Sequence, residues 1–144
     1  MTTTDFEQLA RQAFPQVDQP GPVEALDQLW NCLFDLPCWY FLAIPANHDS
    51  DQGQPFQWDR RMDGKFWLLA FTELERGQAF AAKQNLANDA GQVPFLSMSV
   101  TESLEYLESC QGTAVEGIRF NEGSAYGWAV PVEDVARIYA HLGR

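Results

Sequence analysis

The sequence predicts a single α/β (α+β) domain whose mixed parallel and antiparallel sheet, of about five to six strands, is flanked by helices. Apolar runs of strand length alternate with amphipathic helical patterns, which is typical of crossover units with parallel strands. An Asp63-Gly64 pair joins two strand-like runs, the signal of an antiparallel β-hairpin. The 144 residues are the usual size of one domain, and 46% of them are hydrophobic.

The N-terminal part is expected to form a helix and a linker over residues 1–22, ahead of the main α/β unit at 23–144. Helical periodicity predicts the helix over about 5–14, with capping-box spacing between Thr4 and Glu7. The linker contains two of the eight prolines, of which the second is suited to open the next helix. Both helices are amphipathic, so both are expected to pack against a larger core.

The apolar run WYFLAI at 39–44 predicts a strand covered on both faces, and the polar segment 45–55 predicts a loop. Next comes the hairpin FQWDRRM-DG-KFWLLAF. A type I′ turn at 63–64 requires positive φ at both residues and places Trp58 opposite Leu69. The second arm is apolar on both faces, so we expect it to be a central strand.

Capping boxes predict two of the helices that follow the hairpin. Thr72 with Glu75, and Ser99 with Glu102, have the required spacing. A short strand is expected between these helices, at 93–98. The chain then closes with strands at 117–121 and near 127–130 and a last amphipathic helix.

The closing segment GIRFNEGSAYGWAVP carries most of the candidate binding residues. Strand alternation places Ile118 and Phe120 in the core and turns the intervening polar side chains to the other face. Trp58 and Trp128 lie in strands with polar alternate positions, so we expect both indoles to reach the surface. The candidate binding residues are Arg119, Asn121, Glu122, Trp128 and Trp58.

Two of these residues have a structural interpretation beside the functional one. Asn121 precedes Glu122-Gly123, where its side chain can cap the turn and tolerate an unusual φ. Arg119 is suited to a salt bridge with one of twenty acidic residues. The alternative is that Arg119 and Trp128, on adjacent strands, form the basic and aromatic halves of a recognition patch.

The acidic balance, 20 acids against 9 bases and a net charge of −11, weighs against nucleic acid or an anionic membrane as partner. Arg60, Arg61 and Lys65 make only a small basic patch. The N-terminus lacks the basic and apolar segments of a signal peptide, and no apolar stretch approaches the length of a membrane span. We therefore expect a cytoplasmic protein.

No motif predicts a cofactor, a metal or a catalytic centre. The chain has two histidines, His48 in the polar loop and His141 in the last turn of the last helix. The segment HDSD at 48–51 offers an imidazole and two carboxylates, but no further fixed ligand, so we interpret it as a solvated loop. Phosphate-binding glycine motifs and the nucleophile-elbow motif are absent from the sequence.

The three cysteines form neither a disulfide framework nor a zinc motif, because their number is odd and no CxxC pair occurs. We expect Cys32, Cys38 and Cys110 to be reduced thiols in or near the core. A redox pair between Cys32 and Cys38, six residues apart, is the alternative.

Four segments share their order with a known family: WYFLAIP, GKFWLLAFTELER, PFLSMSVTESLEYL and GIRFNEGSAYGWAVPVEDVARI. Phe71-Thr72 matches an F-T pair that ends a strand and caps a helix, and Asn121 with Gly123 matches an N-x-G turn. Over about residues 38–142 the chain thus resembles the SseB-like N-terminal domain. It departs from that pattern at Glu122, where the family often has a proline. The resemblance implies the fold and a secretion or toxin context, and it implies no catalytic residues.

These observations favour a non-catalytic module that binds a protein partner or a small ligand, where the 117–130 hairpin meets the ends of neighbouring strands. One alternative is an immunity-type or secretion-associated protein whose acidic surface binds a basic protein partner. Another is an enzyme with a small polar site around Arg119, Asn121 and Glu122, which a deep pocket with a titrating carboxylate would favour.

Overall fold

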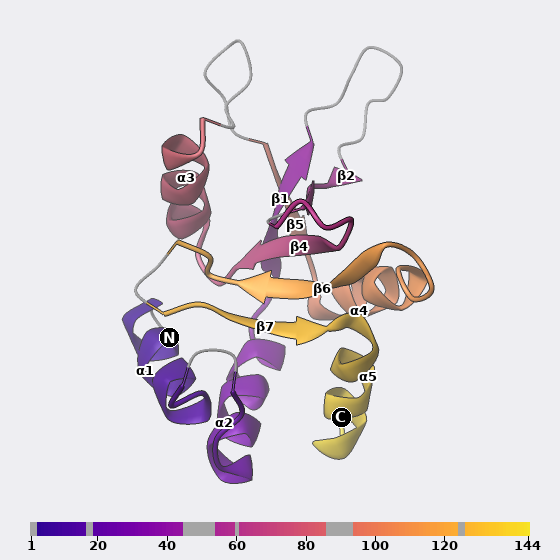
Figure 1. The fold of residues 1–144 in the computed structure, drawn as a ribbon. Coiled ribbons are helices and arrows are strands. Elements are labelled where there is room, and N and C mark those ends of the chain that lie inside the picture. The colour runs from indigo at the N-terminus through magenta and orange to yellow at the C-terminus, as the bar shows by residue number, and fades with distance from the viewer. Residues whose placement is uncertain (1–2, 17–18, 45–53, 60, 86–93, 124–125) are drawn as a thin grey trace.

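The computed structural model describes residues 3–16, 19–44, 54–59, 61–85, 94–123 and 126–144. In these ranges it has five helices and seven strands (Figure 1). In chain order they are α1 (Thr3–Ala13), α2 (Val23–Phe34), β1 (Trp39–Ile44), β2 (Gln54–Pro55), β3 (Gln57–Trp58), β4 (Phe66–Phe71), α3 (Leu74–Lys83), β5 (Phe95–Met98), α4 (Val100–Ser109), β6 (Val115–Phe120), β7 (Trp128–Pro131) and α5 (Val132–His141). The predicted single α+β domain with a mixed sheet is confirmed.

The sheet runs in the order β2-β1-β4-β6-β7, with β3 paired to β4 and β5 paired to β1. β4 and β6 are parallel, and every other described pair is antiparallel. The predicted crossover therefore connects β4 to β6. The intermediate strand β5 does not join that parallel pair, because it lies on the far side of β1.

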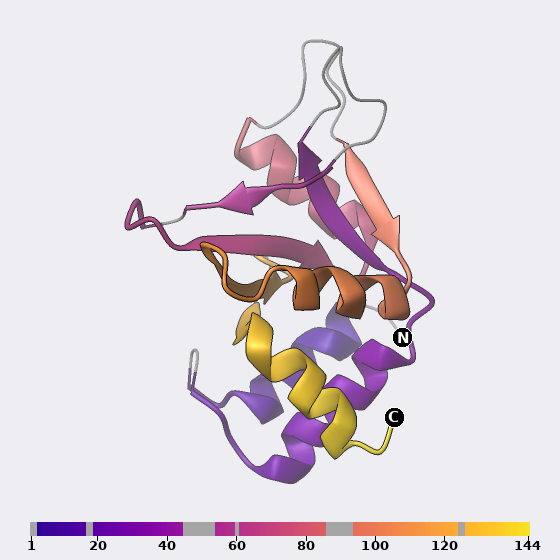
Figure 2. The ribbon, with the colours of Figure 1, turned by 90° about the vertical axis from the view of Figure 1, so that its right-hand side faces the viewer.

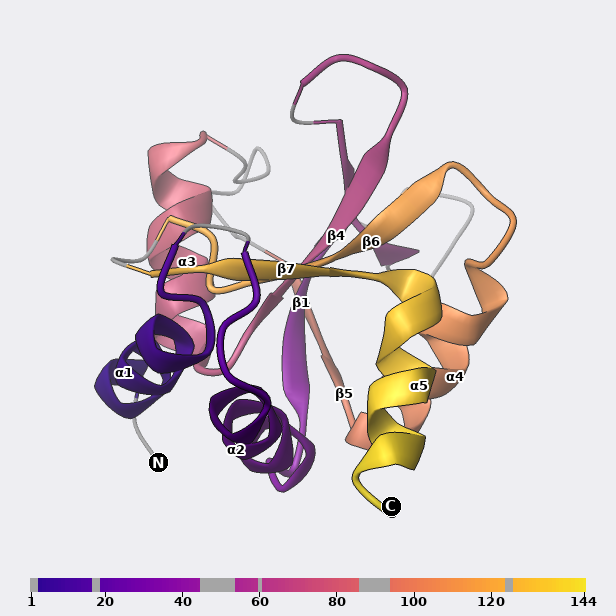
Figure 3. The ribbon, with the colours of Figure 1, turned by 60° about the horizontal axis from the view of Figure 1, so that its bottom comes forward.

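Helices cover the two faces of the sheet unequally. The larger core lies under α1, α2, α4 and α5, which share one side of the sheet in Figure 2, and it includes Leu68, Ile118 and Trp128 from the strands. A smaller cluster on the other face joins α3 to Leu69 and Phe71 of β4. Figure 3 shows α3 at one end of the sheet, so this helix covers only part of the second face.

Proline or a capping box sets the start of three helices, and the sequence predicts this for α2 and α4. α2 and α5 begin directly after Pro22 and Pro131, which are their N-caps. At α4 the Ser99 hydroxyl accepts from the Glu102 backbone N–H at 3.1 Å, while the Glu102 carboxylate accepts from the Ser99 N–H. α1 extends back to Thr3, so Thr4 lies within the helix and the predicted capping role for Thr4 is wrong.

The predicted cap of α3 is also wrong. Its N-cap is Glu73, and no side chain caps the helix there. Thr72 is instead buried, with 6% of its surface exposed, and hydrogen bonds with Asn121 of the closing segment. The Thr72 hydroxyl, which the local pattern predicts as the cap of α3, instead bonds to Asn121, a residue distant in sequence.

The register of the β3–β4 hairpin differs from the prediction by two residues. Trp58 pairs with Trp67 and not with Leu69. Positive φ occurs at Met62 (54°) and Gly64 (79°), so the turn is not a two-residue type I′ turn. Because the shift is even, Trp58 stays on the predicted face of the sheet.

The Asp59 carboxylate explains the longer turn. Its two oxygens accept from the backbone N–H groups of Asp63 at 3.0 Å and Gly64 at 3.1 Å. These bonds close a loop over 59–65, which takes residues out of the strand predicted before the Asp-Gly pair. Arg60 lies outside the described residues, as does the 48–51 segment.

Candidate functional site

Arg119 and Trp128 lie on opposite faces of the sheet. In the β6–β7 pair Arg119 faces Ala129, and Trp128 faces Phe120. The Trp128 side chain is buried, with 1% of its surface exposed, and stacks on the Phe120 ring at 5.4 Å between centroids. The expectation that Trp128 reaches the surface is therefore wrong, and so is the proposed Arg119–Trp128 patch, because directly paired residues share a face and adjacent ones do not.

Asn121 is a buried connection between two strand ends. Its φ is +53°, as the turn interpretation predicts, and none of its surface is exposed. The Asn121 Oδ1 accepts from the Thr72 backbone N–H at 3.0 Å, and its Nδ2 donates to the Thr72 hydroxyl at 3.1 Å. The side chain thus holds the end of β6 to the end of β4, and it is not exposed on the surface.

Arg119 and Glu122 form a half-buried ion pair. The Arg119 Nε donates to Glu122 Oε2 at 2.8 Å, and the two side chains are 11% and 14% exposed. The Arg119 guanidinium also lies over the Trp67 ring, 5.5 Å from its centroid. The salt-bridge interpretation of Arg119 is confirmed, and its aromatic partner is Trp67 of β4.

Trp58 lies on β3 next to Trp67 of β4, and its side chain is only partly exposed to solvent. It is half-buried, and its ring meets the Phe80 ring of α3 edge-on at 5.8 Å. Since it pairs directly with Trp67, the two indoles lie on the same face of the sheet. Of the five predicted binding residues, only Arg119 lines a described pocket.

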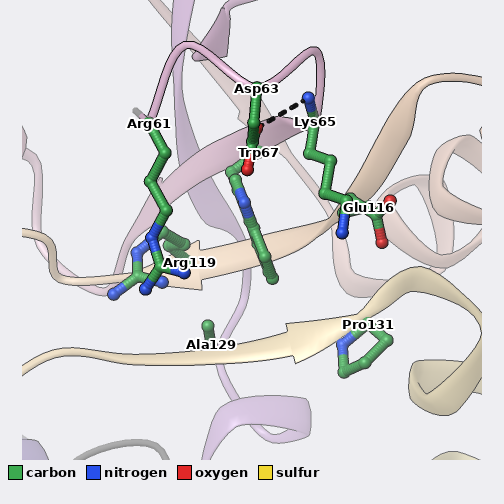
Figure 4. Close-up of a pocket in the computed structure, with 8 residues that line it drawn as sticks. All are labelled: Arg61, Asp63, Lys65, Trp67, Glu116, Arg119, Ala129 and Pro131. Carbon is green, nitrogen blue, oxygen red and sulfur yellow. Dashed lines mark hydrogen bonds between the residues drawn. The ribbon is translucent and has the colours of Figure 1, made fainter. Parts of the chain in front are cut away.

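That pocket, about 320 Å³ in volume, lies on the face of the sheet that carries Trp67. Figure 4 shows the Trp67 indole in the middle, with the β7 side chains below it and the loop 59–65 above it. No helical residue of the described chain lines this space. We name it the Trp67 pocket, lined by Arg61, Asp63, Lys65, Trp67, Glu116, Arg119, Ala129 and Pro131.

Small residues in the strands make room for the indole. Gly117 pairs with Trp67 across the parallel β4–β6 ladder. A Cβ atom at Gly117 would lie 2.2 Å from the Val130 carbonyl oxygen and 2.7 Å from the Trp67 ring. Ala129 is the neighbouring floor residue on β7. The sequence therefore forms a hollow here because Gly117 on β6 and Ala129 on β7 carry minimal side chains on this face.

The loop 59–65 brings two cations to the rim of the pocket. The Asp63 carboxylate accepts from the Lys65 backbone N–H at 3.0 Å, which is the dashed contact in Figure 4, and this bond adds to those of Asp59. Arg61 points down from the loop toward the end of the pocket where Arg119 lies (Figure 4). The small basic patch predicted from the sequence thus contributes to a concave site.

The charges around the pocket differ from those of the whole chain. Three of its lining residues are cationic and two are acidic, while the chain carries a net charge of −11. Within the described ranges, Arg61 has no ion pair with any acidic residue. An exposed guanidinium without an acidic partner, in an acidic protein, is suited to attract an anion.

A second hollow lies between α2 and α5 and is mainly apolar. Val23, Leu26 and Ile138 contribute to its walls. At its rim the His141 Nε2 lies 3.2 Å from the Asp27 carboxylate. His141 is in the last turn of α5, as predicted.

The cysteines are free thiols in the structure. Cys110 is buried, while Cys32 and Cys38 are half-buried. Burial raises the pKa of the Cys110 thiol, and burial together with the nearby Asp35 carboxylate raises the pKa of Cys32. A raised pKa keeps both thiols protonated and weakly nucleophilic.

Neither a metal cluster nor a membrane span is found in the part of the chain that the structure describes. It contains no group of three or more His, Cys, Asp or Glu side chains arranged to hold a metal ion. Its helices are also too short or too polar to cross a membrane. The predicted HDSD segment lies outside these residues.

Comparison with known proteins gives no assignment: no protein-family model matches the chain, and no curated protein matches it.

Proposed function

We propose that this protein is a non-catalytic, cytoplasmic binding module of the SseB-like kind, which binds a protein partner or a small ligand at the Trp67 pocket. The observation that carries the proposal is the half-exposed Trp67 indole, which has two arginine side chains on one side of it in a concave part of the sheet. Tryptophan and arginine are the residue types that most often dominate binding energy at protein surfaces.

The position of the family-like motifs is compatible with this proposal. The F-T pair at Phe71-Thr72 and the turn at Asn121-Gly123 meet through the buried Thr72–Asn121 hydrogen bonds. Together they join the ends of β4 and β6, the two parallel strands that carry Trp67 and Arg119. These motifs therefore support the strands that form the pocket and supply no group to the pocket itself.

The candidate polar site for catalysis receives less support from the geometry. Asn121 points to Thr72 and Glu122 is bonded to Arg119, so the three residues do not surround one cavity. A catalytic carboxylate must reach the reacting group of a substrate, and Glu122, the carboxylate of this set, does not line the Trp67 pocket. A binding role needs only the Arg119 and Trp67 surfaces that are present.

The test is capture of partners from native cytosol by the full chain and by variants of the pocket. We expect Trp67→Ala and Arg61→Glu to lose a partner that the unaltered chain retains. Arg137→Ala is the matched control, because Arg137 is an arginine on α5 that is 77% exposed and ion-paired with Asp134, outside the Trp67 pocket. Melting temperatures of all variants show whether the fold is kept.

Capture of the same partner by every variant would overturn the proposal that a protein partner binds at the Trp67 pocket. A basic protein that all variants retain, and that dissociates at high salt, would instead favour the alternative in which the acidic surface binds a basic partner. Arg61→Glu separates the two cases, because added negative charge should strengthen the binding of a basic partner and weaken binding at the Trp67 pocket.

A further inference from the structure

Two guanidinium groups at one end of the Trp67 pocket have hydrogen-bond donors to spare. Arg119 uses its Nε for Glu122, and its two terminal nitrogens donate to no residue in the described ranges. Arg61 is exposed and has no hydrogen-bond or ion-pair partner there. Figure 4 shows both side chains at the same end of the pocket, to one side of the Trp67 ring.

The rest of the pocket is apolar next to the arginines and charged at the opposite end. Trp67, Ala129 and Pro131 supply the apolar part of the lining, and Figure 4 shows the Trp67 ring between the arginines and Pro131. Lys65 and Glu116, one cation and one anion, lie at the far end in Figure 4. A ligand that fits this order has an anionic group at one end and an apolar body next to it.

The acidic lining residues select the kind of anion. Asp63 and Glu116 carry negative charge into the same space of about 320 Å³. A doubly charged phosphate would be repelled by both carboxylates, whereas a single carboxylate carries half that charge. A carboxylate is also planar, and its two oxygens match the paired N–H donors of a guanidinium.

We infer that the Trp67 pocket binds a monocarboxylate with a planar apolar body, its carboxylate on Arg61 and Arg119 and its body against Trp67 and Pro131. The inference rests on the proposed function, whose ligand class it names. The volume suits a group as small as an aromatic amino acid derivative. This chemistry has two sources, a free aromatic acid or the C-terminal aromatic residue of a polypeptide.

The experiment is a titration of the isotope-labelled full chain followed by NMR. The probes are N-acetylphenylalanine, its primary amide and inorganic phosphate. We expect the acid to shift the Trp67 indole signal and the backbone amides of Arg119 and Ala129. The amide should bind about tenfold more weakly, because it loses the charge-assisted hydrogen bonds, and phosphate should bind more weakly than the acid.

Variants assign the carboxylate contact. Arg61→Gln should weaken binding of N-acetylphenylalanine about tenfold, whereas Arg137→Gln on α5 should leave it unchanged. Arg61 is an exposed loop residue, so its replacement is not expected to unfold the chain. Arg119→Lys keeps the charge but loses the planar fork, and it should also weaken binding.

Equal affinity for the acid and the amide would overturn the inference, as would tighter binding of phosphate or an unchanged affinity in Arg61→Gln. The peptide N-acetyl-Ala-Ala-Phe separates the two sources: tighter binding than the single residue indicates a chain terminus, and equal binding indicates a small acid. If no probe binds while Trp67→Ala still abolishes partner capture, the inference fails and the proposed function stands. If the acid binds but Trp67→Ala captures the partner normally, the pocket serves a small ligand, and the protein-partner form of the proposed function fails.

Discussion

Replacing Asn121 with alanine should lower the free energy of unfolding by about 2–4 kcal/mol. The larger part comes from the Thr72 backbone N–H, which donates to Asn121 Oδ1 at 3.0 Å between two buried residues. Without that acceptor a buried donor stays unsatisfied, which costs about 1–3 kcal/mol. The φ of +53° adds roughly 1 kcal/mol, because alanine tolerates the left-handed region less well than asparagine.

Two companion variants separate these contributions. Asn121→Gly loses the same hydrogen bonds but adopts the positive φ freely, so it should be more stable than Asn121→Ala by roughly 1 kcal/mol. Thr72→Ala keeps the backbone N–H donor and loses only the hydroxyl contacts, so it should cost about 1 kcal/mol. The double variant Thr72→Ala/Asn121→Ala should be less destabilised than the sum of the singles, because both remove the same contact.

The assay is urea unfolding followed by far-ultraviolet circular dichroism, with the unfolding free energy extrapolated to water for each variant. Thr101→Ala on the exposed side of α4 is the control and should stay within about 0.5 kcal/mol of the unaltered chain. A loss below about 0.5 kcal/mol for Asn121→Ala would refute the buried connection. Equal stability of the alanine and glycine variants would refute the role of φ.

Two further predictions concern the pocket floor and the core. Gly117→Ala should lower the free energy of unfolding by about 3 kcal/mol, because its Cβ would overlap the Val130 carbonyl oxygen. Gly112 has open space around it and a φ of +80°, so Gly112→Ala should lower it by about 1 kcal/mol. Similar losses for the two variants in thermal unfolding would argue against the close approach at Gly117. Because burial raises the pKa of Cys110 above its ordinary value of 9.0, the unfolded chain releases this proton first, and stability should fall as pH rises above about 9. Urea midpoints at pH 8 and pH 10 should differ less in Cys110→Ala, and an equal fall in both proteins would count against this.

Local sequence determined where most of the secondary structure lies. Ser99 and Glu102 cap each other within one helical turn, and Pro22 and Pro131 have a fixed φ suited to a helix start. The run Trp39–Ile44 is apolar at every position and forms a strand that pairs on both sides. These signals need no distant partner, since each depends on atoms a few residues apart.

The register of the first hairpin needed information from the surrounding loop. The Asp-Gly pair predicted a two-residue turn, but the Asp59 carboxylate binds two backbone N–H groups and lengthens the loop to 59–65. The short segment of β2 and β3 then pairs with β1 at one end and β4 at the other. A dipeptide preference of this kind is outweighed by hydrogen bonds that become available only in the folded loop.

The candidate site depended still more on the tertiary structure. Arg119 and Trp67 lie 52 positions apart by their numbering, and the parallel β4–β6 pairing brings them together. Trp128 and Arg119 both lie in the predicted hairpin. Arg119 pairs with Ala129, however, and Trp128 pairs with Phe120, so Trp128 lies on the core face. Sequence alternation states that two residues point to opposite sides of one strand. Which residue of another strand stands beside each of them is decided only when the strands pair, because that choice depends on burial and packing across the whole sheet.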